Sequence, residues 1–207
     1  MLAGGADNIA DVSARPRILI LFAHPYSHAS RVNRAMAEAA QGLPHVTLCD
    51  LYETYPDFHI DVKREQAALA AQDVVVLQHP FYWYSCPSLL KEWIDSVLEY
   101  GWAYGNGGNA LHGKDMVQAI STGGPDFAYR ADGYNQVTMQ ELLRPFERSA
   151  LLCGMNYRAP FLIQGVRTKS AAEIADHAAA YVDWLTAYPH PRDCVHCDQP
   201  VVPETDR

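Results

Sequence analysis

Residues 74–95 read VVVLQHPFYWYSCPSLLKEWID and contain the pattern of a strand, a loop and a helix. The β-branched, apolar run Val74–Leu77 is typical of a strand that is buried on both faces, and it ends near polar His79. Four aromatic residues follow at Phe81–Tyr84, and after Pro87 apolar residues recur with the 3.6-residue period of a helix. This order is typical of an open α/β protein whose ligand lies beyond the carboxyl end of a strand.

Four more apolar runs give the rest of the predicted sheet. They lie at residues 17–22, 46–49, 116–121 and 157–164, and helical patterns separate them. Five strands that alternate with helices predict a parallel sheet with helices on both faces. We expect an open α/β fold with strand order 2-1-3-4-5, in which a ligand crevice opens between the first and third strands.

Three positions match signals for the start of a helix. Ser30 is predicted to cap a helix over residues 31–40. Thr138 with Glu141, and Ser170 with Glu173, match capping boxes, in which each residue bonds to the backbone of the other.

The composition indicates a single globular domain. The 207 residues carry a formal net charge of −8, and phosphate backbones require a basic face, so we expect no nucleic-acid partner. We expect one domain over residues 15–188, flanked by flexible tails at 1–14 and 189–207. With no apolar signal core or membrane-spanning run, the expected location is the cytoplasm.

The five cysteines are scattered along the chain, which is typical of reduced thiols. Cys194 and Cys197 form half of a zinc site, but the prolines around them favour a flexible tail, and we expect no metal. The segment at 108–115 is similar to a phosphate-binding P-loop. It lacks the required Ser or Thr at Asp115 and precedes a strand instead of following one, which argues against an ATPase.

The loop at residues 23–33 leads from the first strand into a helix. The N-terminus of a helix offers unpaired backbone N–H groups and the positive end of its dipole, which suits a phosphate. His24 and Arg31 can add positive charge, while Ser30 and Asn33 add neutral donors. The alternative is an ordinary capped helix with solvated polar residues.

Two further loops follow the third and fourth strands. The aromatic residues Phe81–Tyr84 can border a flat ring, although a partly buried aromatic cluster or a dimer contact explains them as well. The paired glycines of Ser121–Gly124 let the backbone approach a ligand closely, although a plain turn is the alternative. Because parallel strands end at the same edge of a sheet, the three loops together predict a site for a flat ring that carries a phosphate.

Several segments resemble one known family. They are AHPYSHASRVN (23–33), LYETYPDFHIDVKREQ (51–66), QHPFYWYSCPSLLKEWID (78–95), GWAYGNGGNALHGK (101–114) and STGG (121–124). They are similar to the flavodoxin-fold NAD(P)H:quinone oxidoreductases, and within these to the ancillary flavoproteins of bacterial glutathione-regulated potassium-efflux systems. The resemblance covers most of residues 17–165.

The resemblance implies a bound flavin, FMN rather than FAD, in a homodimer whose sites lie at the subunit interface. It places the flavin phosphate at His24, Ser30, Arg31, Val32 and Asn33. It places the ring between two sets of residues, which are Phe81, Tyr82, Trp83 and Tyr84 on one side and Ser121, Thr122, Gly123 and Gly124 on the other.

A related branch of quinone reductases uses a Tyr and a His after the glycine turn to assist hydride transfer. Tyr129 matches the Tyr, whereas the His has no counterpart in the segment Gly133–Asn135. The resemblance therefore implies Tyr129 as a catalytic residue without the His partner.

The implied reaction is ping-pong: NADH or NADPH gives a hydride to flavin N5 and leaves, and a quinone then takes the electrons from the same face. The alternative is a flavin-binding regulatory subunit that docks on the cytoplasmic domain of a potassium-efflux transporter, with secondary redox activity. It would then lie at the inner face of the membrane through its partner. A one-electron carrier is a third hypothesis, which His24, His28 and Arg31 disfavour because such carriers usually have a Ser/Thr-rich phosphate loop.

Overall fold

A computed structural model describes residues 15–189. The predicted tails lie outside these residues, apart from Pro189, and so do Cys194 and Cys197. None of the helices in the described part of the chain has the length and apolarity that a membrane crossing requires.

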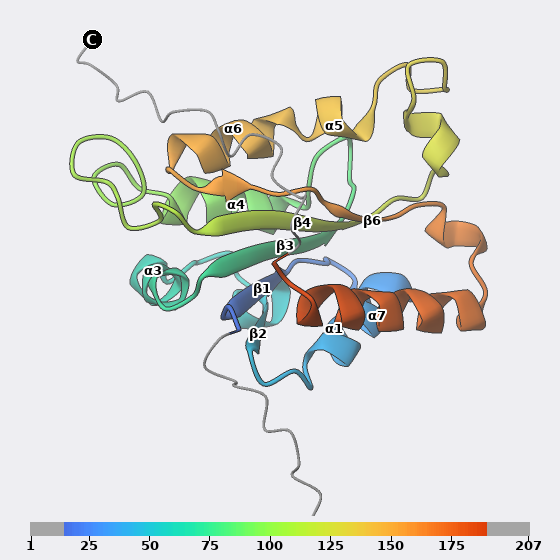
Figure 1. Cartoon of the computed structure of the whole chain (residues 1–207), viewed down its shortest axis with the longest axis horizontal. Coiled ribbons are helices and arrows are strands. Elements are labelled where there is room, and N and C mark those ends of the chain that lie inside the picture. Colours follow the sequence, from blue (N-terminus) through green and yellow to red (C-terminus); the bar gives the residue numbers. More distant parts are fainter. Residues whose placement is uncertain (1–14, 190–207) are drawn as a thin grey trace, which may run out of the picture.

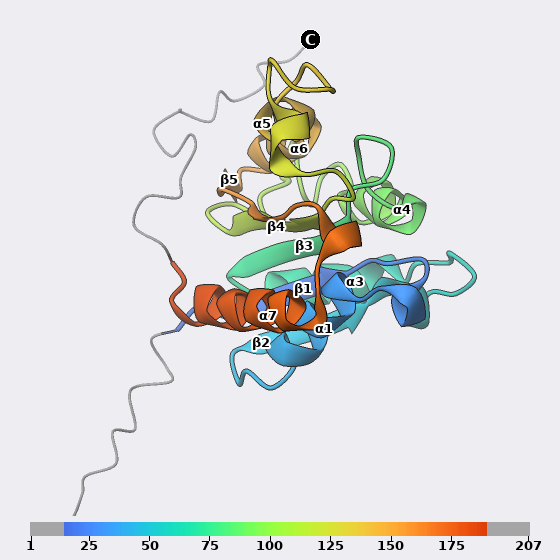
Figure 2. The same cartoon turned by 90° about the vertical axis from the view of Figure 1, so that its right-hand side faces the viewer.

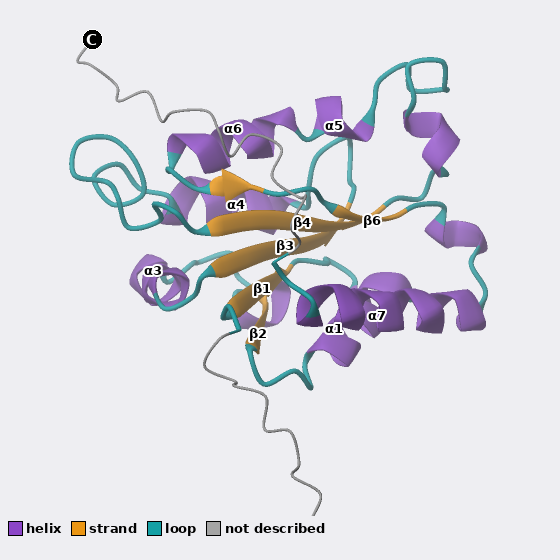
Figure 3. Cartoon of the chain, in the orientation of Figure 1, coloured by secondary structure: helices purple, strands orange, loops and turns teal. Residues whose placement is uncertain are grey.

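A parallel β-sheet forms the centre of the protein, with strand order β2-β1-β3-β4-β5 (Figures 1 and 3). Its strands are β1 (Ile18–Phe22), β2 (Val46–Asp50), β3 (Val74–Pro80), β4 (Asp115–Ser121), β5 (Asn156–Tyr157) and β6 (Phe161–Ile163). This order confirms the predicted flavodoxin-like fold.

The last strand position is occupied by two short segments. Both β5 and β6 pair with β4 in parallel, and residues 158–160 separate them. Pro160 has no N–H group to donate to the ladder, which explains why the predicted strand over 157–164 is interrupted.

Helices cover both faces of the sheet. They are α1 (Val32–Ala40), α2 (Leu51–Thr54), α3 (Val62–Ala70), α4 (Ser88–Val97), α5 (Met139–Leu142), α6 (Arg144–Leu152) and α7 (Ala171–Thr186), together with the 3-10 helices η2 (Ser27–Ala29), η3 (Asp126–Tyr129) and η4 (Val166–Thr168). Helices α1 and α7 lie side by side on one face, and α4 lies across the sheet from them (Figure 2).

Successive side chains of each strand point to opposite faces of the sheet and enter two separate apolar cores. Leu19 and Leu21 pack in the core that contains α3, α4 and α6. Ile18 and Ile20 pack in the core under α1 and α7. A strand that is buried on both faces is usually apolar along its length, which is why β1 reads ILILF.

Both predicted capping boxes are present. Thr138 with Glu141 opens α5, and Ser170 with Glu173 opens α7. The segment that follows Thr138 forms two helices, because α5 ends after one turn and α6 begins at Arg144 with Pro145 in its first turn.

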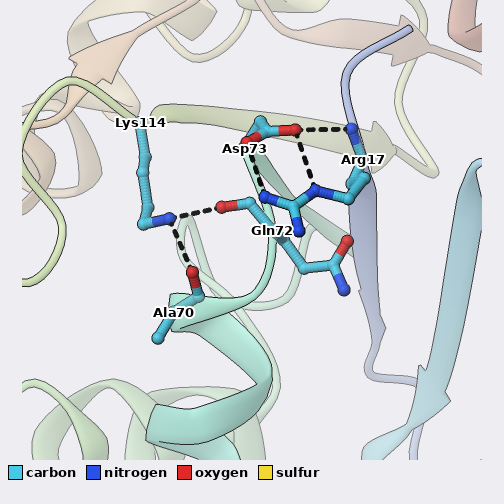
Figure 4. A network of polar contacts seen from close by, with 5 residues as sticks. All are labelled: Arg17, Ala70, Gln72, Asp73 and Lys114. Carbon is cyan, nitrogen blue, oxygen red and sulfur yellow. Dashed lines mark hydrogen bonds and ion pairs between the residues drawn. The ribbon is translucent and has the colours of Figure 1, made fainter. Parts of the chain in front are cut away.

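Polar contacts connect the amino ends of β1, β3 and β4 (Figure 4). Arg17 donates to the carboxylate of Asp73 from its guanidinium and from its backbone N–H, the latter over 2.8 Å. Lys114 donates to the carbonyls of Ala70 and Gln72. These hydrogen bonds hold three neighbouring strands in register at the amino edge of the sheet, opposite to the loops in which the site was predicted.

Candidate functional site

The loops after β1, β3 and β4 meet at the carboxyl edge of the sheet, at the right of Figure 1. Ala23 N–H donates to Gln78 O over 2.9 Å, and Phe81 N–H donates to Ser121 O over 2.8 Å. The first bond joins the start of the loop after β1 to β3, and the second joins the loop after β3 to the end of β4. The structure thus brings together the three segments that the sequence singled out.

The first loop ends at a helix N-terminus that has no cap. The prediction that Ser30 caps a helix is wrong, because Ser30 has an extended backbone and closes the tight turn η2. Arg31 takes the cap position instead, and α1 begins at Val32 without any side-chain cap or acidic residue in its first turn. The free N–H groups and the dipole of α1 therefore remain available to an anion.

Asn33 anchors this helix end to the sheet. It is buried, and its Nδ2 donates to Ser121 Oγ over 2.6 Å, while its backbone carbonyl accepts from Gln78 Nε2 over 2.7 Å. Asn33 Oδ1 and Gln78 Oε1 are buried without a hydrogen-bond partner in the described structure. Such atoms usually find a partner, so these two mark a place where a further donor is missing.

The side chain of His24 points inward from the first loop and is not exposed on its surface. It is buried, and its Nδ1 accepts from Tyr26 N–H over 3.1 Å. Burial lowers the pKa of His24 from its ordinary value, because an imidazolium loses hydration there. The structure therefore contradicts the expectation that His24 adds positive charge. Arg31 is exposed, and the described residues give it no ion-pair partner.

The four aromatic residues after β3 divide into two pairs. Phe81 and Tyr82 are half-buried, and the edge of the Tyr82 ring faces His24 at a centroid distance of 6.1 Å. Trp83 is 94% exposed and Tyr84 is 52% exposed. The outer pair leaves a large aromatic surface at the edge of the site, which is rare unless a ligand or another chain covers it.

The outer pair also has an unusual backbone. Trp83 and Tyr84 have φ angles of 51° and 60°, and Ser85 N–H closes the turn onto Tyr82 O over 2.9 Å. Two successive left-handed residues are the pattern of a type I′ turn, for which Asn and Gly are normally selected. Each bulky residue in this region costs about 1–3 kcal/mol, and such strain concentrates at functional sites.

The glycine turn after β4 has buried and open parts. Ser121 and Thr122 are buried, and Thr122 Oγ1 donates to Gly124 O over 2.7 Å, so their side chains support the turn from inside. Gly123 is exposed and Gly124 half-buried. Backbone groups of the two glycines, rather than the two hydroxyls, are what this turn presents to a ligand.

Tyr129 joins the aromatic residues to the glycine turn. It ends η3, and its ring stands edge-on to Phe81 at 6.0 Å. A Cβ placed on Gly124 would lie 3.3 Å from Tyr129 Oη, so the hydroxyl is close to the glycine backbone. The predicted catalytic tyrosine therefore lies within the site.

Three residues of the site were missed by the sequence analysis. Gln78 supports Asn33, Asn135 accepts from Tyr84 Oη over 3.1 Å, and Arg167 lies against Gly123. Arg167 is exposed, and none of the ion pairs of the described residues includes it. Its place just after β6 is a signal that could have been followed, because this strand ends at the same edge.

These features fit a flavin. The uncapped α1 suits a phosphate, the exposed aromatic turn suits a flat ring, and the Gly123–Gly124 backbone suits the polar rim of that ring. A pocket of about 370 Å3 adjoins the first loop, and Pro25, Tyr26, Tyr52 and Pro56 are among the residues that line it.

A second pocket lies at the amino edge of the sheet. It measures about 470 Å3, and Asp73, Asp115 and Arg158 are among its lining residues. Arg158 Nε lies 3.0 Å from Asp115 Oδ2, and Asp73 bonds to Arg17. Because these charges already satisfy one another, the carboxyl edge is the better candidate for chemistry.

Comparisons with known proteins identify the family to which the chain is similar. Residues 16–185 match a family model described as the flavodoxin-like fold. The glutathione-regulated potassium-efflux system ancillary protein KefG of Serratia proteamaculans is 49% identical over 174 residues, which are 84% of this chain and 95% of the relative.

Two solved structures are also similar. The general stress protein 14 of Treponema denticola, solved in complex with FMN, is 42% identical with a TM-score of 0.79, and the match covers 83% of this chain and 99% of that one. An NADPH-quinone reductase from P. pentosaceus is 30% identical with a TM-score of 0.75, and the match covers 83% of this chain and 98% of that one.

Proposed function

Because the chain belongs to the family of proteins with the flavodoxin-like fold, we propose that it is an FMN-dependent NAD(P)H:quinone oxidoreductase. One observation carries the proposal, namely that an uncapped helix N-terminus, an exposed aromatic turn and an open Gly–Gly turn meet at one edge of the sheet. Each of the three fits a different part of a phosphate-bearing flat ring.

The similar proteins support both halves of this proposal. A structure 42% identical to the chain was solved with FMN, and one that is 30% identical is named as an NADPH-quinone reductase. FMN, when bound, supplies the transfer of hydride from NADH or NADPH and of electrons to the quinone. No pair of acid and base residues is needed in the protein for such chemistry.

In this proposal the chain's own residues bind the phosphate of the cofactor and orient its ring. Backbone N–H groups of Arg31, Val32 and Asn33 would hold the phosphate together with the hydroxyl of Ser30, and Arg31 would add the positive charge. Phe81–Tyr84 would border the ring, and Gly123 and Gly124 would face its polar rim. His24, Ser121 and Thr122 would support these segments from beneath.

Tyr129 is the proposed catalytic residue. Its hydroxyl lies beside the Gly124 backbone, where it would donate a hydrogen bond to the ring and steady the charge that develops there. Packing against Phe81 fixes the direction in which the hydroxyl points.

The activity is tested with FMN-loaded protein, NADH or NADPH, and a simple benzoquinone. The proposal predicts rapid two-electron reduction of the quinone with parallel lines in double-reciprocal plots, as a ping-pong reaction requires. Protein that binds FMN but oxidises neither nucleotide in the presence of quinone would refute the enzymatic assignment.

A second candidate function rests on the relative from S. proteamaculans, which is named as an ancillary protein of a potassium-efflux system. On this reading the chain binds the cytoplasmic domain of a membrane transporter, and its redox activity is secondary. Pull-down with that domain, in the presence and absence of FMN, separates the two functions. Tight binding together with negligible quinone turnover favours the second.

We also propose that the protein works as a homodimer with the site at the subunit interface. The exposed surfaces of Trp83, Phe127 and Tyr134 lie in the two loops around the site, where a second subunit would cover them. Sedimentation velocity at micromolar concentration tests this, and a monomer would contradict it.

A further inference from the structure

A chain of buried polar side chains runs beneath the aromatic turn. His79 of β3, Gln118 of β4 and Tyr157 of β5 lie on the same side of the sheet, and they are 0%, 0% and 6% exposed. Tyr157 Oη lies 2.6 Å from Gln118 Oε1, and Gln118 Nε2 lies 3.2 Å from His79 Nε2. His79 Nδ1 lies 3.0 Å from the carbonyl oxygen of Pro80.

The direction of each hydrogen bond in this chain can be deduced. A carbonyl oxygen only accepts, so His79 Nδ1 carries the proton and donates to Pro80 O. In a neutral imidazole the other nitrogen then accepts, and Gln118 Nε2 donates to His79 Nε2. Gln118 Oε1 in turn accepts from the hydroxyl of Tyr157. All donors point towards Pro80, at the start of the aromatic turn.

The surroundings keep His79 neutral. Phe146 of α6 stacks on the imidazole at 6.0 Å, and burial lowers the pKa of His79 to about 4. A charged group, Glu147, acts on Tyr157 at the far end of these hydrogen bonds, and it pairs with Arg144 at 3.5 Å. Near neutral pH the chain of hydrogen bonds is therefore complete, and each side-chain nitrogen of His79 has one defined role.

This series of hydrogen bonds fixes one peptide group at the base of the aromatic turn. Pro80 O accepts from His79, and Phe81 N–H on the other side of the same peptide donates to Ser121 O over 2.8 Å. The strained residues Trp83 and Tyr84 follow directly, and strain of this kind persists only where the surrounding structure over-determines it. A peptide held on both sides is such a support.

We infer that His79 is a positioning residue, which fixes the Pro80–Phe81 peptide through its Nδ1–H and thereby holds the aromatic turn in shape for a flat ring. The identity of that ring rests on the proposed function, whereas the bonding of His79 does not. Gln118 and Tyr157 act one step away, because they supply the hydrogen bond to Nε2, while the Pro80 carbonyl keeps the proton on Nδ1.

The chemistry provides a matched pair of variants. In His79→Asn the amide nitrogen is as far along the side chain as Nδ1, so it can still donate to Pro80 O. In His79→Gln the amide is one carbon further out, so it reaches Gln118 and leaves Pro80 O without a donor. FMN binding by fluorescence titration is expected to weaken about tenfold in His79→Gln and less than threefold in His79→Asn. Equal loss in both variants, or no loss in either, would overturn the inference.

The tautomer is measured on the wild-type protein, so that neither variant has to fold. The inference predicts ¹⁵N NMR signals of a protonated Nδ1 and an unprotonated Nε2 in His79 at pH 7, and a proton on Nε2 would overturn it. Tyr157→Phe is expected to leave Nδ1 protonated and to shift the Nε2 signal. Wild-type protein that shows the expected tautomer but binds no FMN would refute the proposed function and leave the role of His79 standing.

Discussion

At the scale of single residues, Tyr129 is the side chain on which the proposed chemistry depends most. Its hydroxyl lies beside Gly124, and its ring packs edge-on against Phe81. The two contacts can be separated, because Phe has the same ring without the hydroxyl.

We expect Tyr129→Phe to retain the fold and FMN binding but to slow hydride transfer at least about tenfold, as loss of a positioned donor does. Single-turnover reduction of the FMN-loaded protein by NADH or NADPH measures this rate. Tyr100→Phe is the control, because Tyr100 is 66% exposed and lies outside the three loops of the site. If the rate is unchanged in Tyr129→Phe, the residue is only a wall of the site.

His79 provides a prediction for the pH dependence of stability. Burial lowers its pKa from 6.5 to about 4, so the unfolded chain takes up a proton at a pH where the folded protein does not. The stability due to this difference is fully present above pH 6.5 and falls as the pH drops towards 4. Its total is about 3 kcal/mol.

Urea unfolding at pH 7 and pH 5 measures this effect. Between these values His79→Asn is expected to lose about 2 kcal/mol less stability than the wild type, since Asn does not titrate. The comparison cancels the contribution of His24, whose pKa is lowered in the same direction. Identical losses in the two proteins would show that His79 is not held neutral by the fold.

The residues of the site show what a sequence can and cannot reveal. His24 and Asn33 were correctly associated with the first loop, yet both are buried, and the loss of hydration at His24 removes the charge expected of it. Arg167 was missed because its contact with Gly123 joins segments 44 residues apart. The local pattern shows that Arg167 follows a strand ending at the same edge, but not which residue it contacts.

At the scale of elements, the aromatic turn is the clearest conflict between local preference and the observed structure. Trp83 has a φ of 51°, a conformation that Asn adopts far more easily than an aromatic residue, and it buries almost none of its side chain. A conformation that is costly in this way needs a compensating use, and ligand binding is the one proposed.

We therefore predict that Trp83→Asn stabilises the ligand-free protein by about 1 kcal/mol in urea unfolding. The same variant is expected to bind FMN more weakly, because it loses the aromatic surface. Trp83→Phe serves as the control, since it keeps both the strain and the ring. An equal gain in stability from Phe and Asn would mean that relief of backbone strain is not the cause.

Elements with strong local signals were predictable. The apolar runs identified every strand position, and the pairs Thr138–Glu141 and Ser170–Glu173 located two helix starts. The failures have local physical causes that a coarse pattern overlooks. Pro160 interrupts the last strand, and the η2 turn takes Ser30 away from the helix that it was expected to cap.

At the scale of the whole molecule, the two edges of the sheet differ in character. At the amino edge the charges are paired with one another, as in Arg17–Asp73 and Arg158–Asp115. At the carboxyl edge lie an uncapped helix, an exposed strained turn and the cations Arg31 and Arg167. The position of β1 beside β3 creates this opening. It was predictable because right-handed crossovers leave few orders for alternating strands and helices, and 2-1-3-4-5 is a common one.

The central claim is that this carboxyl edge binds FMN, and a titration of the purified protein with FMN tests it most directly. The account predicts saturable binding of one FMN per chain, with a shifted flavin spectrum and quenched flavin fluorescence. Gly124→Val should weaken binding strongly, because a side chain there would lie where the backbone is proposed to face the ring, and its Cβ would also lie 3.3 Å from Tyr129 Oη. Gly42→Val should not weaken binding, because a Cβ at Gly42 meets no atom within 4 Å. Wild-type protein that binds no FMN, or Gly124→Val protein that binds it as tightly as Gly42→Val, would contradict the account.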